Sequence, residues 1–249
     1  MPFLLIWNLH AHYSIQPSWN IPYPRNPFFT GCNEILSLVY HRLQQNENGM
    51  RISKPQALTG LGGIGKTQVA IEYAYRHFQD YHMILWASAE TRETFITGYI
   101  TIATQLNLPE MNNQNQEVIV QAVLQWLSIN HEWLLILDNA NDLTVICEFI
   151  PSSFNGHVLI TTQAQAMGGL AYRIEVPTME NDIGALFLLR RAGFITQDDS
   201  VEAVSPDDFT HAVNIVQEMG GLPLALDQAG AYMEEMQVDL VTYWSHYQS

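Results

Sequence analysis

Short apolar runs alternate with amphipathic segments along most of this chain. A continuous apolar run bounded by polar or turn residues predicts a buried strand, and apolar residues three or four positions apart predict a helix. We expect strands at residues 55–60, 83–87, 133–138, 158–161 and 173–176. We expect helices between them at residues 31–45, 67–78, 91–106 and 118–127. The alternation predicts an α/β fold, in which helices cover both faces of a parallel sheet.

The strand pattern stops after about residue 177. Three helical patterns follow, at residues 181–192, 207–219 and 223–235, with an acidic loop expected at residues 197–208. Arg190 and Arg191 end the first of these helices, where we expect them to interact with the helix dipole. The pattern predicts a lead-in at residues 1–20, an α/β domain at residues 21–178 and a small helical subdomain at residues 179–249.

A glycine-rich segment separates the first predicted strand from the helix that follows it. From Gly60 to Thr67 its sequence is Gly-Leu-Gly-Gly-Ile-Gly-Lys-Thr, the G-x-x-x-x-G-K-[ST] pattern of a phosphate-binding loop. Lys66 is one of only two lysines in the chain. Backbone N–H groups of such a loop bind phosphate oxygens at the positive end of the helix, and the lysine contacts the β- and γ-phosphates. The alternative is a glycine-rich turn that binds nothing.

These features predict a P-loop NTPase fold with a parallel sheet flanked by helices, followed by the small helical subdomain. The nucleotide-binding residues that we expect in the loop are Gly60, Gly62, Gly63, Ile64, Gly65, Lys66, Thr67 and Gln68.

A carboxylate closes another apolar run, because the strand at residues 133–138 ends in Asp138. We expect Asp138 and the Thr67 hydroxyl to hold Mg²⁺, and Asp138 is the only candidate for a catalytic role. The next residue is Asn139, and an amide cannot act as the base that activates water. Hydrolysis is therefore expected to be slow, or to need a group from elsewhere. Neither lysine stands in the Asn-Lys-x-Asp pattern that recognises guanine, which favours adenine, as ADP or ATP.

In their order along the chain, these motifs resemble the NB-ARC domains of STAND-class P-loop NTPases, and above all the bacterial and fungal ones. Besides the glycine loop and the strand ending at Asp138, the segments that carry the resemblance are residues 25–31, residues 157–162 and the Gly-Leu-Pro-Leu-Ala-Leu motif at residues 221–226. The resemblance implies that Phe29, Thr30, Gln163 and Pro223 also lie at the nucleotide. It implies a two-domain signalling switch that self-associates after ADP is exchanged for ATP.

Three departures from the family pattern change these expectations. Gln163 stands where a sensor arginine is usual, and an amide can accept or donate a hydrogen bond but cannot neutralise a γ-phosphate. Cys32 stands where the family often has arginine. The sequence ends at Ser249, soon after the helical subdomain, so the winged-helix and repeat regions of the family are expected to be missing.

Composition limits the partners. The formal net charge of −15 argues against a general nucleic-acid or anionic-membrane surface, but it allows a single nucleotide to bind at backbone N–H groups. Two widely spaced cysteines and an apolar N-terminus without a basic region or cleavage site favour a reducing cytoplasm.

Three functions remain open on the sequence. The first is an adenine-nucleotide switch with slow or absent hydrolysis. The second is a small-molecule kinase or a working ATPase, although no site for an acceptor substrate is recognisable. The third is an interaction scaffold without nucleotide turnover, which Gln163 and Cys32 favour.

Overall fold

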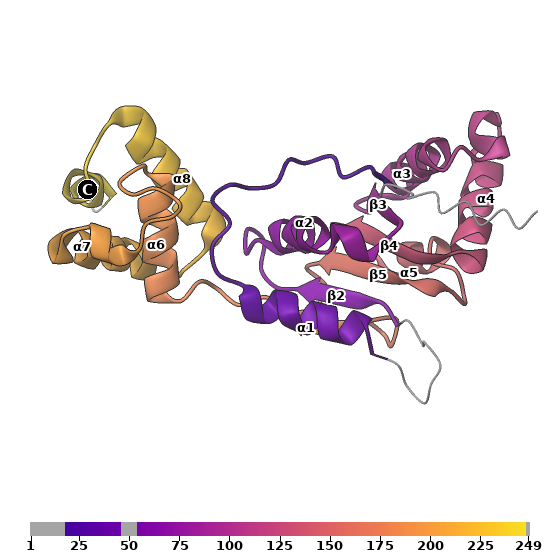
Figure 1. The fold of residues 1–249 in the computed structure, drawn as a ribbon, viewed down its shortest axis with the longest axis horizontal. Coiled ribbons are helices and arrows are strands. Elements are labelled where there is room, and N and C mark those ends of the chain that lie inside the picture. Colours follow the sequence, from indigo (N-terminus) through magenta and orange to yellow (C-terminus); the bar gives the residue numbers. More distant parts are fainter. Residues whose placement is uncertain (1–17, 46–53, 248–249) are drawn as a thin grey trace, which may run out of the picture.

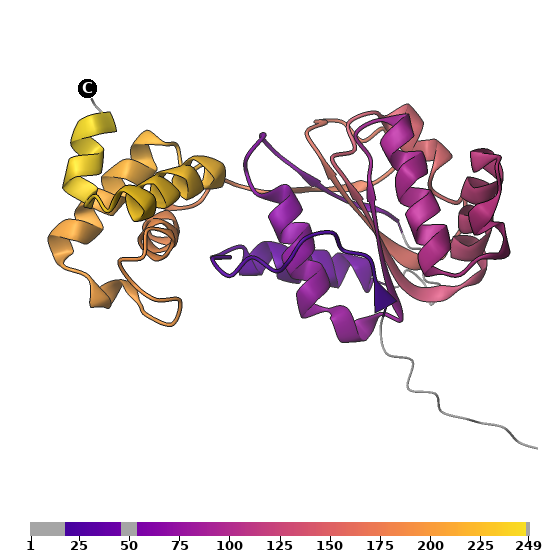
Figure 2. The same ribbon diagram turned by 90° about the horizontal axis from the view of Figure 1, so that it is seen from above.

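A computed structural model describes residues 18–45 and 54–247 of the chain. These residues form two lobes joined by a narrow connection (Figures 1 and 2). We call residues 18–176 the α/β lobe and residues 179–247 the helical lobe. Most of the predicted lead-in, residues 1–17, lies outside the described residues.

The α/β lobe is built on one sheet of six parallel strands in the order β1-β3-β4-β5-β2-β6. The strands are β1 (Ser18–Trp19), β2 (Gln56–Thr59), β3 (Met83–Ser88), β4 (His131–Asp138), β5 (Asn155–Thr162) and β6 (Tyr172–Glu175). The strand before the glycine loop, β2, and the strand that ends in Asp138, β4, are therefore not neighbours. β5 lies between them and pairs with both.

Helices cover both faces of this sheet, which confirms the predicted fold class. The helices of this lobe are α1 (Asn33–Leu43), α2 (Lys66–Arg76), α3 (Arg92–Gln105), α4 (Gln116–Ile129) and the short α5 (Leu143–Glu148). Short 3₁₀ turns are η1 (Phe78–Asp80) and η2 (Pro109–Asn112). One hydrophobic core lies between the sheet and α1 and α2, and the other lies between the sheet and α3, α4 and α5.

Strand β4 shows how the sequence fills both cores. Leu134 and Ile136 pack towards α1 and α2, whereas Leu135 and Leu137 pack towards α3 and α4. Successive side chains of a strand point to opposite faces, so a strand buried on both faces needs the continuous apolar run seen here. Trp133, at the start of the run, is completely buried and occupies the space that a side chain at Gly156 of β5 would need.

The helical lobe packs four helices around a core of its own. They are α6 (Asn181–Arg191), α7 (Pro206–Glu218), α8 (Pro223–Met236) and α9 (Leu240–Tyr247), with the 3₁₀ turn η3 (Val201–Ala203) before α7. The sequence pattern did not predict β1, α5 or α9. The predicted acidic loop also ends earlier than expected, because Asp207 and Asp208 lie in the first turn of α7, where carboxylates interact favourably with the helix dipole.

Candidate functional site

The glycine-rich segment forms the loop between β2 and α2 that the sequence predicts. Gly63 and Gly65 have φ angles of 75° and 91°, a left-handed conformation that strongly favours glycine. Gly65 is the N-cap of α2, and Lys66 is its first residue. The loop therefore leads into the positive end of a helix, where backbone N–H groups are available to an anion.

Lys66 is folded onto its own loop. Its ammonium donates hydrogen bonds to the carbonyl oxygens of Gly60, at 3.0 Å, and Leu61, at 2.7 Å. The residue is only 9% exposed, and burial lowers the pKa of Lys66, although the nearby charge of Asp138 opposes this effect. A buried ammonium with carbonyl partners is a charge that a phosphate group would stabilise further.

Asp138 lies at the carboxyl end of β4 and is hydrogen-bonded by two hydroxyls. Its Oδ1 accepts from Thr67 Oγ1 at 2.7 Å and from Thr161 Oγ1 at 2.6 Å. Thr161 comes from β5, the strand between β2 and β4, and its Oγ1 also accepts from the backbone N–H of Asn139 at 2.9 Å. The carboxylate is therefore oriented by α2, through Thr67, and by β5, through Thr161.

The oxygens of Thr67 and Asp138 suit Mg²⁺, which prefers oxygen ligands and usually keeps several waters. Within residues 18–45 and 54–247, no group of three or more His, Cys, Asp or Glu side chains is placed to hold a metal ion. A Mg²⁺ at Asp138 would therefore take its remaining ligands from phosphate oxygens and water, as expected for a nucleotide-bound ion.

The predicted site residues surround a cavity of about 520 Å³ between the two lobes. Those that line it are Phe29, Thr30, Gly62, Gly63, Ile64, Gly65, Lys66, Thr67, Gln68, Asp138, Gln163 and Pro223. Gly60 is the exception. A Cβ there would lie 3.0 Å from the carbonyl oxygen of Val176, so the glycine allows the loop to approach the chain after β6 closely. Gly60 takes part in the site through its carbonyl oxygen, which accepts a hydrogen bond from the Lys66 ammonium.

The helical lobe contributes more to this cavity than Pro223, the one residue expected from it. Met179, Phe187, Leu224 and Asp227 also line the cavity, and the backbone N–H of Leu224 donates to the Gly63 carbonyl at 3.2 Å. The motif at residues 221–226 could have indicated Leu224. No local pattern marks Phe187 or Asp227, because they reach the cavity only through the packing of α6 and α8.

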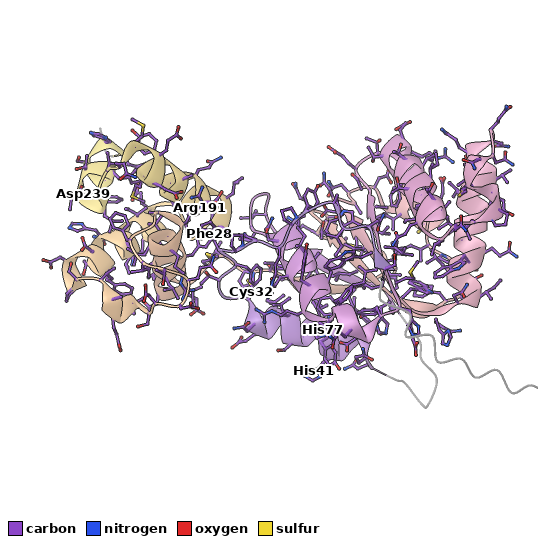
Figure 3. All side chains as sticks on the ribbon, turned by 45° about the horizontal axis from the view of Figure 1, so that its top comes forward. Phe28, Cys32, His41, His77, Arg191 and Asp239 are labelled. Atoms are coloured by element: carbon purple, nitrogen blue, oxygen red, sulfur yellow. The ribbon has the colours of Figure 1, made fainter. Side chains whose placement is uncertain are left out.

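The segment before α1 forms another part of the wall. Tyr23, Asn26 and Cys32 line the cavity together with Phe29 and Thr30. Cys32 has a φ of 59°, and burial raises the pKa of its thiol, which favours the neutral form. Figure 3 shows Phe28 and Cys32 at the junction between the lobes. A neutral thiol at this position supplies none of the positive charge of an arginine.

Gln163 follows β5 and is exposed at the edge of the cavity. Its backbone N–H donates to Asn141 Oδ1 at 2.9 Å, and its side-chain amide lies near Gly62 of the glycine loop. A helix cap lies close by, since Asp142 accepts from the backbone N–H groups of Thr144 and Val145 at the start of α5. Asn139 lines the cavity, but its amide offers no proton acceptor of useful basicity.

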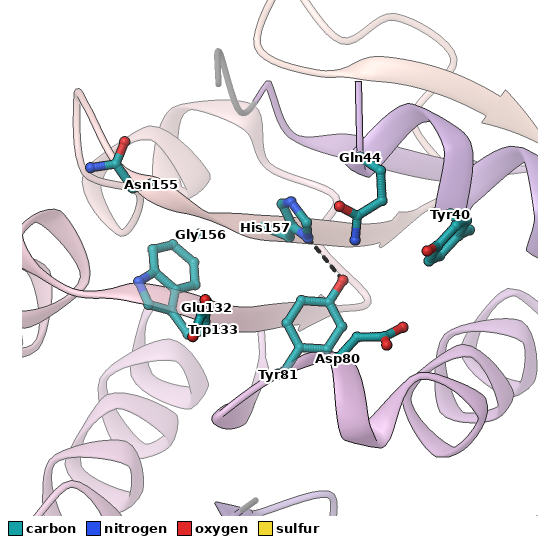
Figure 4. Close-up of a pocket in the computed structure, with 9 residues that line it drawn as sticks. All are labelled: Tyr40, Gln44, Asp80, Tyr81, Glu132, Trp133, Asn155, Gly156 and His157. Atoms are coloured by element: carbon teal, nitrogen blue, oxygen red, sulfur yellow. Dashed lines mark hydrogen bonds between the residues drawn. The ribbon is translucent and has the colours of Figure 1, made fainter. Parts of the chain in front are cut away.

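A second, smaller cavity of about 200 Å³ lies at the opposite, amino-terminal end of the strands (Figure 4). Tyr81 and His157 meet there, with 2.8 Å between Tyr81 Oη and His157 Nδ1, and Tyr81 Oη also lies 3.1 Å from Tyr73 Oη. Burial raises the pKa of both tyrosines. This cavity shares no lining residue with the glycine-loop cavity.

The sheet order, the glycine loop and the position of Asp138 together define a P-loop NTPase-like fold. Comparison with solved structures supports this fold. The chain resembles the ORC2 protein of Aeropyrum pernix in its ADPNP–ADP complexes, with a TM-score of 0.55 and 16% identity over 90% of this chain and 70% of that one. It also resembles a STAND protein with a tetratricopeptide repeat sensor from Pyrococcus horikoshii, with a TM-score of 0.53 and 15% identity over 82% of this chain and 30% of that one.

Sequence relatives narrow the class. The chain is 29% identical over 260 residues to a nucleotide-binding leucine-rich repeat (NLR)-like protein of Hyaloscypha variabilis, covering 93% of this chain. It is 24% identical over 210 residues to the regulatory protein AfsR of Streptomyces griseus, covering 80% of this chain. The chain spans 25% and 20% of the lengths of these two relatives. No family model matches it. The predicted resemblance to NB-ARC and STAND P-loop NTPases is confirmed.

In the part of the chain that the structure describes, no helix combines the length and the apolar character that crossing a lipid bilayer requires.

Proposed function

We propose that this chain is an adenine-nucleotide-binding module that acts as a signalling switch and hydrolyses ATP slowly or not at all. One observation carries the proposal: the cavity at the glycine loop is walled by both lobes, with Lys66 on one side and Pro223 and Leu224 on the other. A ligand that contacts both walls stabilises the arrangement in which the lobes are docked. Release or exchange of the ligand shifts that equilibrium.

The charge around the cavity favours ADP over ATP as the tightly held nucleotide. Among the described residues that line the cavity, Lys66 is the only lysine or arginine, whereas Asp138 and Asp227 are both acidic. Mg²⁺ at Thr67 and Asp138 would offset part of the phosphate charge. Gln163 would leave the additional charge of a γ-phosphate without a cationic partner, so the third phosphate gains less from binding than the second.

The same residues favour slow turnover. A water that attacks the γ-phosphate needs a group to orient it and take its proton, and Asn139 cannot take a proton. Asp138, the remaining catalytic candidate, already accepts hydrogen bonds from Thr67 and Thr161. The site is therefore better suited to holding a nucleotide than to consuming it.

The setting that we propose is the cytoplasm. The thiols of Cys32 and Cys147 are both free, which fits a reducing compartment, and the net charge of −15 disfavours nucleic acids and anionic membranes as partners. Self-association in the nucleotide-exchanged state is the proposed output, in line with the resemblance to STAND proteins.

The test is to identify the nucleotide that the protein carries. Freshly purified protein is denatured, and the released small molecules are separated by chromatography. We expect ADP in an amount close to that of the protein. If no adenine nucleotide is released and equilibrium dialysis detects no uptake of ADP, the proposal is wrong and a scaffold without nucleotide function is favoured. Rapid multiple-turnover consumption of ATP would instead favour a working ATPase or a kinase.

A further inference from the structure

Residues 25–31, which we call the strap, belong to the α/β lobe, line the cavity and contact both lobes. Two adjacent rings of the strap belong to different cores. Phe28 packs against the core of the helical lobe, and Phe29 packs against the core beneath α1 and α2. Asn26, Phe29 and Thr30 line the cavity itself. A shift of the helical lobe that displaces Phe28 would therefore also displace Phe29 and Thr30, which line the cavity.

Local hydrogen bonds hold the strap in a single shape. Asn26 Oδ1 accepts from the backbone N–H of Phe28 at 2.9 Å, and the Asn26 carbonyl accepts from that of Phe29 at 3.3 Å. The Thr30 hydroxyl donates to the Phe28 carbonyl at 2.9 Å. An asparagine that bonds the backbone two residues on forms a compact turn. Because of this turn, Phe28 cannot move without moving Phe29 and Thr30.

The α/β end of the strap is fixed by a buried carboxylate. Glu72 of α2 accepts two hydrogen bonds from the Arg25 guanidinium, at 2.9 and 2.8 Å, and one from Arg76 at 2.7 Å. The guanidinium of Arg76 lies 6.0 Å from the centre of the Phe29 ring. Paired fork-shaped contacts of this kind fix direction as well as distance. The strap is therefore anchored to the helix that begins at Lys66.

The helical end of the strap has a matching arrangement around Arg191. The guanidinium of Arg191 lies 5.2 Å from the centre of the Phe28 ring, and it pairs with Asp227 at 2.9 Å and Glu234 at 2.6 Å, both on α8. Figure 3 shows Phe28 and Arg191 close together on the side of the helical lobe that faces the α/β lobe. The Arg191 side chain is only 18% exposed, so these interactions are less screened by water than those of a surface pair.

Asp227 is the member of this group that reaches the cavity. Its Oδ1 accepts from Arg191, its side chain is 49% exposed, and the residue lines the cavity. It follows Pro223 by four residues on α8, which places it on the same helix face and about 6 Å further along the helix axis. Its partner Arg191 contacts Phe28, so Asp227 lies on the strap side of the cavity.

We propose that Arg191 is a positioning residue for the nucleoside end of the cavity: it holds the Asp227 carboxylate on the wall and holds Phe28, and with it the strap, against α6 and α8. This inference rests on the proposed nucleotide function and deepens it. The glycine loop binds the phosphates by itself, whereas the walls around the nucleoside are complete only while Arg191 joins the strap to the helical lobe. Binding of the nucleoside and docking of the helical lobe onto the α/β lobe are then coupled, so that each favours the other.

The experiment compares two ligands on the whole chain by isothermal titration calorimetry, with Mg²⁺ present throughout. ADP reports the whole cavity, and inorganic pyrophosphate reports the glycine loop alone. For Arg191→Ala and for Asp227→Ala we expect ADP affinity to fall about tenfold or more, equivalent to ~1.4 kcal/mol. Pyrophosphate affinity should stay within about twofold, because neither residue lies at the glycine loop.

A matched control is available in Arg92→Ala. Arg92 also pairs with two carboxylates, Glu117 and Glu148, but it lies on α3, away from the cavity. ADP affinity should be unchanged in this variant. Thermal denaturation without ligand identifies a variant that has lost its fold. If Arg191→Ala is unfolded, Asp227→Ala provides the test, because the Asp227 side chain is half-exposed and its removal should leave the fold intact.

Two results would overturn the inference. One is ADP affinity in both variants equal to that of the unchanged protein. The other is an equal loss of ADP and pyrophosphate affinity, which would indicate a general structural role for Arg191. Failure of the proposed function itself gives a different result, because the unchanged protein would then bind neither ligand.

Discussion

The charged groups of the α/β wall, Lys66 and Asp138, are buried, whereas Leu224, the residue of the helical wall that meets the glycine loop, is half-exposed. Lys66 and Asp138 are almost fully buried and are fixed by short hydrogen bonds to their own lobe. Leu224, in contrast, is 50% exposed, and it meets the glycine loop through one backbone hydrogen bond to Gly63 and contacts with that glycine. The α/β wall is therefore held by hydrogen bonds within its own lobe. The helical wall is held at the glycine loop only by contacts between the lobes, so we expect it to depend more on a ligand in the cavity.

The largest effect should follow from removing the charge of the α/β wall. Lys66→Ala should abolish the stabilisation of the protein by ADP and Mg²⁺, which for an intact site amounts to ~2.7 kcal/mol at a ligand concentration 100 times the Kd. The measurement is thermal denaturation with and without ligand. The control is Lys54→Ala. Lys54 is the other lysine of the sequence, and it lies over the ring of Tyr172, outside the cavity. Full ADP stabilisation in Lys66→Ala would contradict the site.

The metal dependence of the α/β wall is the next test. Asp138→Asn should remove most of the gain in ADP affinity that Mg²⁺ provides, a loss of about tenfold, since an amide is a poorer Mg²⁺ ligand than a carboxylate. Titrations with Mg²⁺ and with a chelator measure the difference. Asp142→Asn is the control, because asparagine also caps a helix well and Asp142 is outside the cavity. An unchanged Mg²⁺ effect in Asp138→Asn would remove Asp138 from the metal site.

The contact between the walls can be broken at a single glycine. A Cβ at Gly63 would lie 3.1 Å from the Cβ of Leu224 and would strain a φ of 75°, so Gly63→Ala should cost ~1–2 kcal/mol and loosen the helical wall. Chemical denaturation measures the cost, and limited proteolysis of residues 176–180 measures the loosening. Gly62→Ala is the neighbouring control, because a Cβ there meets Gln163 at an ordinary 3.7 Å. Equal behaviour of the two variants would contradict the close packing of Leu224.

The smallest effect concerns the anchor of the strap on α2. Burial alone would raise the pKa of Glu72, but hydrogen bonds and charge from Arg25 and Arg76 outweigh it and hold the pKa below its usual value. A carboxyl whose pKa is lower in the folded state stabilises the protein above its unfolded-state pKa, and this stability is lost as pH falls through the folded value.

We therefore expect Glu72→Gln to lower the free energy of unfolding at pH 7 by about 1 kcal/mol, since both arginine partners are partly exposed. The difference from the unchanged protein should start to shrink as pH falls below about 4.3, the usual pKa of a glutamate, and should vanish only below the lower folded-state pKa. Urea denaturation across this pH range measures it. A difference that persists in acid would assign the effect to packing instead of charge.

The sequence predicted the α/β wall far better than the helical wall, for a physical reason. The glycine loop, Lys66, Thr67 and Asp138 obey local rules: a turn conformation, a helix start and a strand end. Strand order is not local, and the position of β5 between β2 and β4, which brings Thr161 to Asp138, follows only from the folded sheet.

The helical wall depends on partners that are distant in sequence. Arg191 was expected to interact with the dipole of its helix, and its place at the end of α6 fits that expectation. Its ion-pair partners Asp227 and Glu234 are 36 and 43 residues away in sequence, and Phe28, whose ring it contacts, is further away still. The strands and helices that were missed were short. β1 has two residues, too few for an alternation to be recognised, and it exists because β3 offers an edge.

The packing of Trp133 over Gly156 has a consequence for how relatives of this chain can diverge. The two positions on neighbouring strands share a single volume, which the indole fills. A larger residue at position 156 becomes acceptable only after position 133 has become smaller, so a single change at Gly156 should be selected against while the paired change is tolerated. In an alignment of relatives, the sizes of these two residues should be inversely correlated, and the glycine at position 156 should accompany the tryptophan at position 133.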